Sequence, residues 1–275
     1  MRRQYAYMSD LLPPRRDLVV SIVSHGHGEL VQRVLHDLAL AGGQFVRRVV
    51  LTLNQPHETA PVLNADWPFE VQIRRNSKPR GFGANHNAAL AGAEESCVCI
   101  MNPDVRLPKD SSSDSGLEPF STMISLALRP GTGCVYPGQI DERGVVQDSE
   151  RALPSPSALW RRRILKQPDI CVDWVNAACL VISSAVWTKV GGFDERYFLY
   201  CEDVDLSLRL RLMDLKLVKA PVLVQHVGQH DSHRRLRYLA WHVASLLKLW
   251  SSPVYRRARH LLPADTRLPR TIGHS

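Results

Sequence analysis

The stretch GFGANHNAALAGAEESCVCIMNPD, residues 81–104, decides the fold because three features follow one another in it. It opens with glycines and continues as an alanine-rich segment, which predicts a helix. Residues 97–101 are all apolar, as is typical of a strand that is buried on both faces. The strand ends in an Asn102-Pro103-Asp104 turn. A helix followed by a short buried strand is the unit of a largely parallel α/β sheet.

The same alternation extends upstream as far as residue 18. Strands are predicted for LVVSIVS (residues 18–24), FVRRVVLTLN (45–54) and FEVQIRRN (69–76), with a one-sided apolar helix at ELVQRVLHDLALAG (29–42). Open α/β sheets bind ligands beyond the carboxyl ends of their strands. The residues that follow these strands are therefore the first candidates for a functional site.

Downstream the pattern is less regular. We expect a polar loop at 109–116, a helix at 117–128, a hairpin at 138–148, one strand at 173–183 and another strand at 215–226. Residues 232–250 form a basic amphipathic pattern that predicts a helix, and a Pro/Arg-rich tail, expected to be partly disordered, follows it.

Composition excludes several classes of protein. With 275 residues, 44% hydrophobic and 23% charged, the chain is suited to a globular domain. Its net charge of +8 favours anionic partners, but no aromatic residues interleave the basic clusters, which argues against nucleic acid. No signal peptide or membrane span is predicted. The six cysteines lack CxxC spacing and are expected to be buried, reduced thiols of a cytoplasmic protein.

Two acidic sites are candidates for chemistry. Asp104 follows a buried strand, where a carboxylate can bind a divalent cation together with diphosphate oxygens, although Asn-Pro-Asp is also an ordinary turn. Glu202 and Asp203 open a predicted helix, where acids cap and complement the dipole. Three acids within four residues, after an aromatic run, exceed what a cap requires. Asp203 is therefore also a candidate general base.

Histidine and glycine patterns limit the kinds of metal site and cofactor-binding fold that the sequence predicts. His226 ends a predicted strand and is either structural or the single imidazole of a carboxylate–phosphate metal site, since no HExxH or paired cysteine indicates zinc. Residues 76–87 follow a strand and open a helix, so backbone amides there can bind phosphate. This segment lacks both the GxGxxG spacing and the GK[ST] motif, which disfavours dinucleotide and P-loop folds.

Taken in this order, the segments resemble family 2 of the inverting glycosyltransferases, particularly the rhamnosyltransferase-like members of bacterial surface-polysaccharide pathways. The resemblance covers about residues 19–250 and rests on NSKPRGFGANHNAAL (76–90), MNPDV (101–105) and WVNAACLVISSAVWTKVGGFDERYFLYCEDVDLSLRLR (174–211). The string GGFDE, aromatic residues, EDVDL and arginine is its most specific part.

The resemblance implies an α/β protein of the GT-A fold, with a mixed, mostly parallel central sheet flanked by helices and a C-terminal amphipathic helix. It implies a GT-A domain over residues 1–230, with a nucleotide-binding half at about 17–105 and an acceptor half at about 106–230. Residues 231–275 would form the basic amphipathic helix and tail.

The resemblance also implies roles for individual residues. Asp104, with Asn102 beside it, matches the metal-binding acidic motif, and His226 matches a histidine that helps hold Mg²⁺ or Mn²⁺ and the diphosphate. Asp203 matches the catalytic base and Glu202 its acidic neighbour near the acceptor. Residues expected around the donor and acceptor are Asn76, Arg80, Gly83, Asn87, Trp174 and Asn176.

The implied reaction transfers a sugar from a nucleotide-diphosphate carrier, with dTDP-rhamnose as a candidate, to a saccharide or a lipid-diphosphate-linked saccharide. The C-terminal helix either packs on the domain or contacts an anionic membrane, which would place the enzyme at the inner face of the cytoplasmic membrane. No nucleic acid partner is expected.

Two positions depart from the family pattern. Ser24-His25-Gly26-His27 replaces the usual Thr-Tyr-Asn after the first strand, and Leu53 stands where an Asp usually holds the nucleobase. A sugar nucleotidyltransferase is an alternative, but SHGHGEL is a poor version of the glycine-rich basic loop that it requires. A non-catalytic scaffold or binding protein that retains the fold is another alternative.

Overall fold

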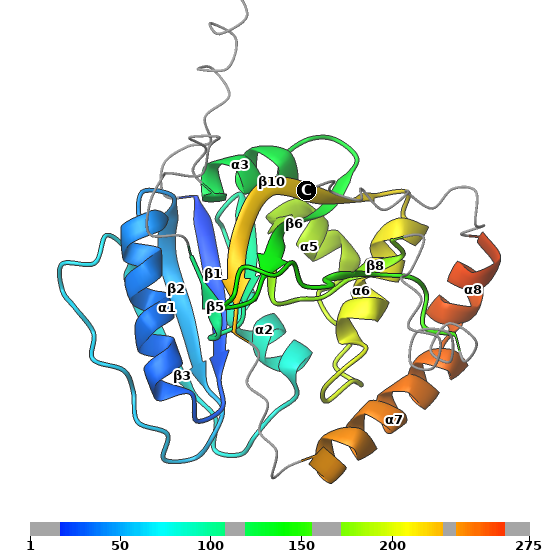
Figure 1. Cartoon of the computed structure of the whole chain (residues 1–275), viewed down its shortest axis with the longest axis horizontal. Helices are drawn as coiled ribbons and strands as arrows, with labels where there is room; N and C mark the ends of the chain where they lie inside the picture. The colour runs from blue at the N-terminus through cyan, green and yellow to red at the C-terminus, as the bar shows by residue number, and fades with distance from the viewer. Residues whose placement is uncertain (1–16, 108–118, 156–171, 228–234, 262–275) are drawn as a thin grey trace, which may run out of the picture.

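The computed structural model describes residues 17–107, 119–155, 172–227 and 235–261. An eight-stranded sheet runs through the molecule, with helices on both faces (Figure 1). Its strand order is β3-β2-β1-β4-β9-β6-β10-β5. The strands are β1 (Leu18–Ser24), β2 (Val46–Leu53), β3 (Glu70–Arg75), β4 (Cys97–Met101), β5 (Val105–Arg106), β6 (Thr132–Ile140), β9 (Cys179–Ser183) and β10 (Lys216–His226).

One half of the sheet is parallel and the other half is mixed. Strands β3, β2, β1 and β4 all run in the same direction, as the alternation of strands and helices predicts. Strand β9 lies antiparallel between β4 and β6, and β5 pairs antiparallel with the end of β10. The expected mixed, mostly parallel sheet is therefore confirmed.

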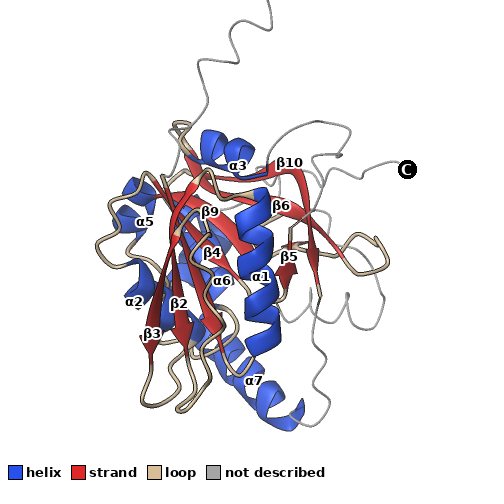
Figure 2. Cartoon of the chain, turned by 90° about the vertical axis from the view of Figure 1, so that its left-hand side faces the viewer, coloured by secondary structure: helices blue, strands red, loops and turns tan. Residues whose placement is uncertain are grey.

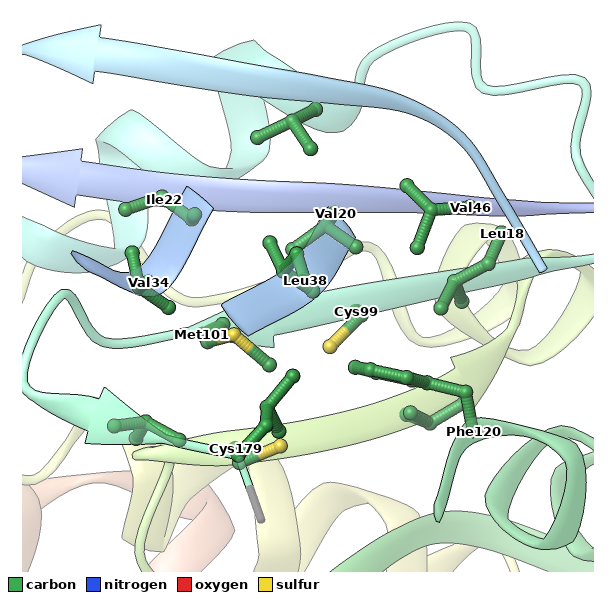
Figure 3. Close-up of a cluster of buried hydrophobic side chains, with 14 of the residues drawn as sticks. Leu18, Val20, Ile22, Val34, Leu38, Val46, Cys99, Met101, Phe120 and Cys179 are labelled. Atoms are coloured by element: carbon green, nitrogen blue, oxygen red, sulfur yellow. The ribbon is translucent and has the colours of Figure 1, made fainter. Parts of the chain in front are cut away.

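Helices cover both faces of this sheet. Helices α1 (Gly28–Ala41) and α3 (Pro119–Ala127) pack on one face, while α2 (Phe82–Leu90), α5 (Ser184–Val190) and α6 (Glu202–Leu212) pack on the other (Figure 2). The side chains of strand β4 alternate between the two hydrophobic cores that lie on opposite faces of the sheet. Cys99 and Met101 face Leu38 and Phe120 (Figure 3), whereas Val98 belongs to the opposite core.

The predicted burial of the cysteines is confirmed for the five that are described. Cys97 and Cys99 share one face of β4, as their spacing predicts, and all five are buried and form no disulfide. Cys171 lies outside the described residues.

The segment expected as one strand at 173–183 forms two. Strand β8 (Trp174–Val175) pairs with β7 (Glu150–Arg151) in a small second sheet, and β9 enters the main sheet. The chain breaks at Asn176, whose side-chain amide exchanges hydrogen bonds of 2.7 and 3.0 Å with that of Gln139. Apolar residues on both sides of the break hid it in the sequence.

The chain after residue 234 forms helices α7 (Arg235–Ser251) and α8 (Pro253–Leu261), which lie at the end of the molecule opposite β3 (Figure 1). The tail, expected to be partly disordered, begins with a helix, α8, that the sequence did not predict. Ser252 caps this helix, since its Oγ accepts a 3.0 Å hydrogen bond from the Tyr255 amide, and Tyr255 and Ala258 are buried in a third core with α6. Residues 262–275 lie outside the described part.

Other expectations have mixed outcomes. The hairpin at 138–148 forms through an antiparallel bridge between Ile140 and Val146, with Gly144 in a left-handed conformation at its turn. The polar loop at 109–116 lies outside the described residues. None of the helices in the described ranges has the length and apolar character needed to cross a bilayer.

Candidate active site

A pocket of about 960 Å³ lies where several strands and helices end. Its lining comes from the loop after β1, the turn after β4, the start of α6 and one face of α7. Its lining includes His25, His27, Asn54, Arg80, Asn102, Asp104, Asn176, Phe198, Tyr200, Glu202, Asp203, His226, Tyr238, Trp241 and His242. The predicted acids and imidazole, which are far apart in the sequence, thus share one cavity.

Sheet register brings His226 next to Asp104. Strand β5 follows the Asn-Pro-Asp turn directly and pairs antiparallel with β10, so that His226 stands opposite Val105. The Val227 amide also donates a 3.0 Å hydrogen bond to the Asp104 carbonyl. As a result, His226 Nε2 lies 3.4 Å from Asp104 Oδ1.

This pair fits a hard divalent cation that takes most of its ligands from a substrate. Asp104 Oδ1 is buried and accepts no hydrogen bond, so the carboxylate has an unused acceptor beside the imidazole. Within the described ranges, no group of three or more His, Cys, Asp or Glu side chains converges as a complete ligand set. Mg²⁺ commonly uses one or two protein carboxylates together with phosphate and water, which these two side chains can accommodate.

Strained backbone precedes the second acidic pair. Tyr200 and Cys201 both adopt left-handed φ angles, 71° and 67°, which are uncommon for residues other than glycine. They turn the chain into α6, whose first turn holds Glu202 and Asp203 at the pocket. The Phe82 amide donates a 2.9 Å hydrogen bond to the Phe198 carbonyl and fixes this segment against α2.

The electrostatics of the pair favour a single proton acceptor. Burial raises the pKa of Asp203 to about 6, although a 2.8 Å hydrogen bond from the Val204 amide favours its charged form. Burial and the neighbouring Asp203 charge raise the pKa of Glu202 well above its usual value. Glu202 Oε2 is buried without a hydrogen-bond partner. Of the two carboxyl groups, Asp203 is therefore the one that ionises more readily near neutral pH.

Arg80, Asn102 and Asn176 line the pocket, as the sequence predicts for residues near the donor or acceptor. The backbone of Arg80 is held by Asn54, through hydrogen bonds of 2.8 Å from its amide and 3.0 Å to its carbonyl. Its guanidinium lies 3.6 Å from Glu195, and both side chains are about half exposed. A cationic group thus stands near the pocket without being buried in an ion pair.

The other four predicted residues do not line the pocket. Asn76 bridges Asn54 and Asn85, and Gly83 packs against Phe193, where a Cβ would come within 2.6 Å of the Phe193 Cβ. Asn87 exchanges 2.8 Å hydrogen bonds with the Phe193 backbone. Trp174 donates through Nε1 to the Ala152 carbonyl. Of the four, Asn76 contacts a lining residue, Asn54, and direct contact of any of them with substrate stays a prediction.

Two groups of pocket residues escaped the sequence analysis. The first is the ring-bearing side chains Tyr238, Trp241 and His242 of α7, a helix that the sequence assigned to a separate C-terminal region. The second is the loop that contains His25 and His27, which had been noted only as a departure from the family. Glu58 holds this loop by accepting hydrogen bonds from the Ser24 hydroxyl and, at 2.9 Å, from the Gly26 amide. No local sequence pattern marks such a contact.

Similarity to curated proteins agrees with this arrangement. No protein-family model matches the chain. It is 27% identical over 276 aligned positions to the N-acetylglucosaminyl-diphospho-decaprenol L-rhamnosyltransferase of Mycobacterium tuberculosis, with 92% of the chain and 86% of the relative covered. It is also 25% identical to rhamnosyltransferase WbbL of Escherichia coli, over 83% of the chain and 90% of that protein. Over most of its length the chain is similar to rhamnosyltransferases, as the resemblance to family 2 of the inverting glycosyltransferases led us to expect.

A solved structure supports the fold of this glycosyltransferase. The mannosyltransferase PcManGT of Pyrobaculum calidifontis, determined in complex with GDP-Man and Mn²⁺, superposes with a TM-score of 0.57. The match covers 93% of the chain and 80% of PcManGT at 14% sequence identity. At that identity the likeness concerns the fold alone, and it confirms the predicted GT-A architecture.

Proposed function

We propose that this glycosyltransferase transfers rhamnose, with inversion and with the help of a divalent metal, to a hydroxyl of a lipid-diphosphate-linked saccharide or polysaccharide. The observation that carries the proposal is the convergence of Asp104, Asp203 and His226 on one pocket. Both relatives are named rhamnosyltransferases, which supports the choice of sugar, and the name of the Mycobacterium tuberculosis protein, which includes N-acetylglucosaminyl-diphospho-decaprenol, supports the choice of acceptor.

Asp203 acts in the proposed mechanism as the general base. Its carboxylate accepts the proton of the acceptor hydroxyl, whose oxygen bonds to the anomeric carbon while the bond from that carbon to the diphosphate oxygen breaks. The nucleoside diphosphate leaves with the electron pair of the broken bond. A pKa of about 6 suits this role, because the group is mostly ionised at neutral pH yet more basic than an ordinary aspartate.

Asp104 and His226 hold Mg²⁺ or Mn²⁺ in this proposal. When bound, the cation supplies charge that stabilises the departing diphosphate. Support comes from the buried, unpartnered Oδ1 of Asp104 and the imidazole beside it. Because leaving-group stabilisation comes from this side of the pocket, one carboxylate suffices for proton transfer, unlike in a glycosidase, which needs two.

The donor is assigned to the side of the pocket formed by the loop after β1, Arg80 and Asn102. Arg80 binds a phosphate of the donor after leaving its partly exposed contact with Glu195, which is weak enough to be exchanged. Leu53 in place of the usual Asp leaves Asn54 as the nearest polar side chain to the end of β2, and Asn54 lines the pocket. Among possible donors we propose dTDP-rhamnose as the first to be tested.

A donor screen tests the proposal. The protein is incubated with Mn²⁺ and separate nucleotide sugars, with an alkyl-diphosphate N-acetylglucosamine as acceptor, and released nucleoside diphosphate and glycosylated product are measured. We expect transfer from dTDP-rhamnose, abolition by EDTA, and a loss of at least roughly a hundredfold in Asp203→Asn. Transfer at an unchanged rate in Asp203→Asn would overturn the role of the base. Absence of transfer and of donor hydrolysis with every nucleotide sugar would overturn the proposed activity.

We also propose peripheral contact of α7 and α8 with the inner face of the cytoplasmic membrane, where a lipid-linked acceptor resides. The exposed face of α7 is apolar, since Leu239, Val243 and Leu247 are 49%, 47% and 59% exposed. Residues 235–261 contain no Asp or Glu. Among the side chains that the structure describes in this region, the exposed cations are Lys248, Arg256, Arg257 and Arg259. An apolar helix face next to uncompensated positive charge is the composition that binds anionic bilayers.

Co-sedimentation with vesicles tests this contact. We expect the protein to pellet with phosphatidylcholine vesicles that contain phosphatidylglycerol, and less so with phosphatidylcholine alone. Val243→Asn with Leu247→Asn should release the protein, as should Arg256→Gln with Arg257→Gln, while Glu142→Gln on the exposed hairpin should not. Equal recovery in the supernatant with and without anionic lipid would remove the membrane proposal, and a change in oligomeric state alone would indicate a self-association surface instead.

A further inference from the structure

Helix α7 forms part of the pocket wall beside the proposed base. Its first turns bring Tyr238, Trp241 and His242 to the same cavity as Asp203, although the sequence separates this helix from the rest of the site. Spacing explains the shared direction, because residues three or four apart lie on one face of a helix, and Trp241 follows Tyr238 by three. The roles proposed above for Asp104, Arg80 and His226 toward a nucleotide sugar give this wall no function.

The rings of this wall contact the rings of the segment before α6 in two places. Trp241 lies 5.0 Å from Phe198 between ring centroids and 5.6 Å from Tyr238. His242 meets Tyr200 edge to face at 4.9 Å. Such separations are those of favourable aromatic pairs, so the rings orient one another. Tyr200, one of the two left-handed residues before Glu202, links this surface to the acidic pair.

Contacts of its second half hold helix α7 against the rest of the protein. The Ser245 hydroxyl donates a 2.8 Å hydrogen bond to the Leu199 carbonyl, and the Lys248 ammonium donates to the carbonyl of Arg196. Leu249 is fully buried, and Trp250 Nε1 donates to the Pro154 carbonyl at 2.6 Å. The Ser245 and Lys248 contacts anchor the second half of α7 to the segment that contains Phe198 and Tyr200, and the Trp250 contact anchors it to the chain after β7. The ring-lined first half is thereby placed over the cavity without needing a ligand to order it.

We propose that Tyr238 and Trp241 of α7, together with Phe198, form the acceptor subsite, on which a pyranose ring of the acceptor saccharide stacks with its hydroxyl directed at Asp203. The inference rests on the proposed function and adds to it the residues that select the acceptor. Sugar rings present an apolar C–H face that binds against aromatic rings, while their hydroxyls bind polar groups at the edge. His242 and Glu202 supply such polar groups in this pocket.

Direct binding and kinetics together test the subsite. The probe is N-acetylglucosamine linked through a diphosphate to a short alkyl chain, titrated calorimetrically into the full chain in the presence of dTDP and Mn²⁺. We expect Trp241→Leu and Tyr238→Leu each to weaken probe binding by roughly three- to tenfold and to raise the acceptor KM in proportion. The donor KM and the slow hydrolysis of donor without acceptor should change by less than about twofold. Trp67→Leu, which removes an indole outside the pocket, is the matched control.

The outcomes separate the subsite from the proposed function. Probe binding that is lost in Trp241→Leu, together with no turnover from any nucleotide sugar, would support the subsite and contradict the transferase activity. Normal transfer with wild-type probe affinity in both variants would overturn the subsite and leave the activity standing. Failure of the wild-type chain to bind this probe or any of a panel of alkyl glycosides would overturn the subsite as well. Circular dichroism of each variant distinguishes lost binding from lost folding.

Discussion

The Nε2 atom of His226 lies 3.4 Å from the Oδ1 atom of Asp104, because the antiparallel pairing of β10 with β5 sets the end of one strand against the turn before the other. Backbone hydrogen bonds on both sides hold this geometry, including the one from the Val227 amide to the Asp104 carbonyl. The pair is therefore a property of sheet register and does not depend on a bound ligand.

Removing either member of this pair should impair metal-dependent transfer. We expect Asp104→Asn to lower kcat/KM by roughly a hundredfold or more and to raise the Mn²⁺ concentration needed for half-maximal activity, since a charged ligand is lost. His226→Ala should cost about tenfold or more. His36→Ala, an exposed histidine on α1, should behave as wild type. Equal Mn²⁺ dependence in Asp104→Asn and wild type would contradict the assignment.

The raised pKa of Asp203 predicts the acid limb of the activity profile. Since burial raises this pKa to about 6, kcat/KM should fall tenfold per pH unit below that value as the base becomes protonated. Activity should level off above about pH 7. The measurement is kcat/KM between pH 5 and 8 at saturating Mn²⁺, and a limb centred near pH 4 would show that burial does not perturb the base.

The same shift has an opposite effect on stability. The pKa of this carboxyl group is about 6 in the folded chain, above its ordinary value of 3.8. Its contribution to stability is therefore fully present below pH 3.8 and is lost as the pH rises through about 6. Asp203→Asn should therefore raise the free energy of unfolding at pH 7.5 by roughly 1–3 kcal/mol while it lowers the transfer rate at least roughly a hundredfold. At pH 4 the two proteins should be similar. Urea denaturation at both pH values tests this, and a destabilised Asp203→Asn at pH 7.5 would refute it.

Glu58 should act on donor binding without touching the donor. Its carboxylate accepts from the Ser24 hydroxyl and the Gly26 amide, and so fixes the loop that brings His25 and His27 to the pocket. We expect Glu58→Gln to raise the donor KM several-fold more than it lowers kcat, and to cost roughly 1–3 kcal/mol of stability. Glu142→Gln, at an exposed carboxylate, should change neither quantity. A fall in kcat at constant donor KM would count against this positioning role.

Gly81 should tolerate no side chain. A Cβ at this position would lie 2.9 Å from the Phe198 carbonyl oxygen, which belongs to the segment that leads into Glu202 and Asp203. Gly81→Ala should therefore destabilise the chain by roughly 1–3 kcal/mol and reduce transfer, because backbone rather than a flexible side chain must move. Gly28→Ala, where no atom lies within 4 Å of the added Cβ, is the control and should be neutral or slightly stabilising. Thermal denaturation of both variants decides the point, and similar melting temperatures would contradict the steric argument.

The local part of this protein follows from the sequence by itself. The apolar runs at Leu18–Ser24 and Cys97–Met101 form β1 and β4, and the alternating residues of β4 divide between the two cores, because side-chain direction in a strand depends only on sequence parity. The candidacy of Asp104 and His226 followed from their positions at strand ends. These inferences depend only on patterns that span a few neighbouring residues, so the sequence contains all the information that they need.

Tertiary structure alone decided which side chains meet in the pocket. Trp174 was expected there but donates to Ala152 outside it, while Trp241 of a helix assigned to another region lines it instead. The contact of Glu58 with Gly26 and the break between β8 and β9 at Asn176 were equally invisible in the sequence. Such contacts depend on how distant elements pack and on which buried polar groups must find partners, and neither requirement leaves a pattern within one short segment.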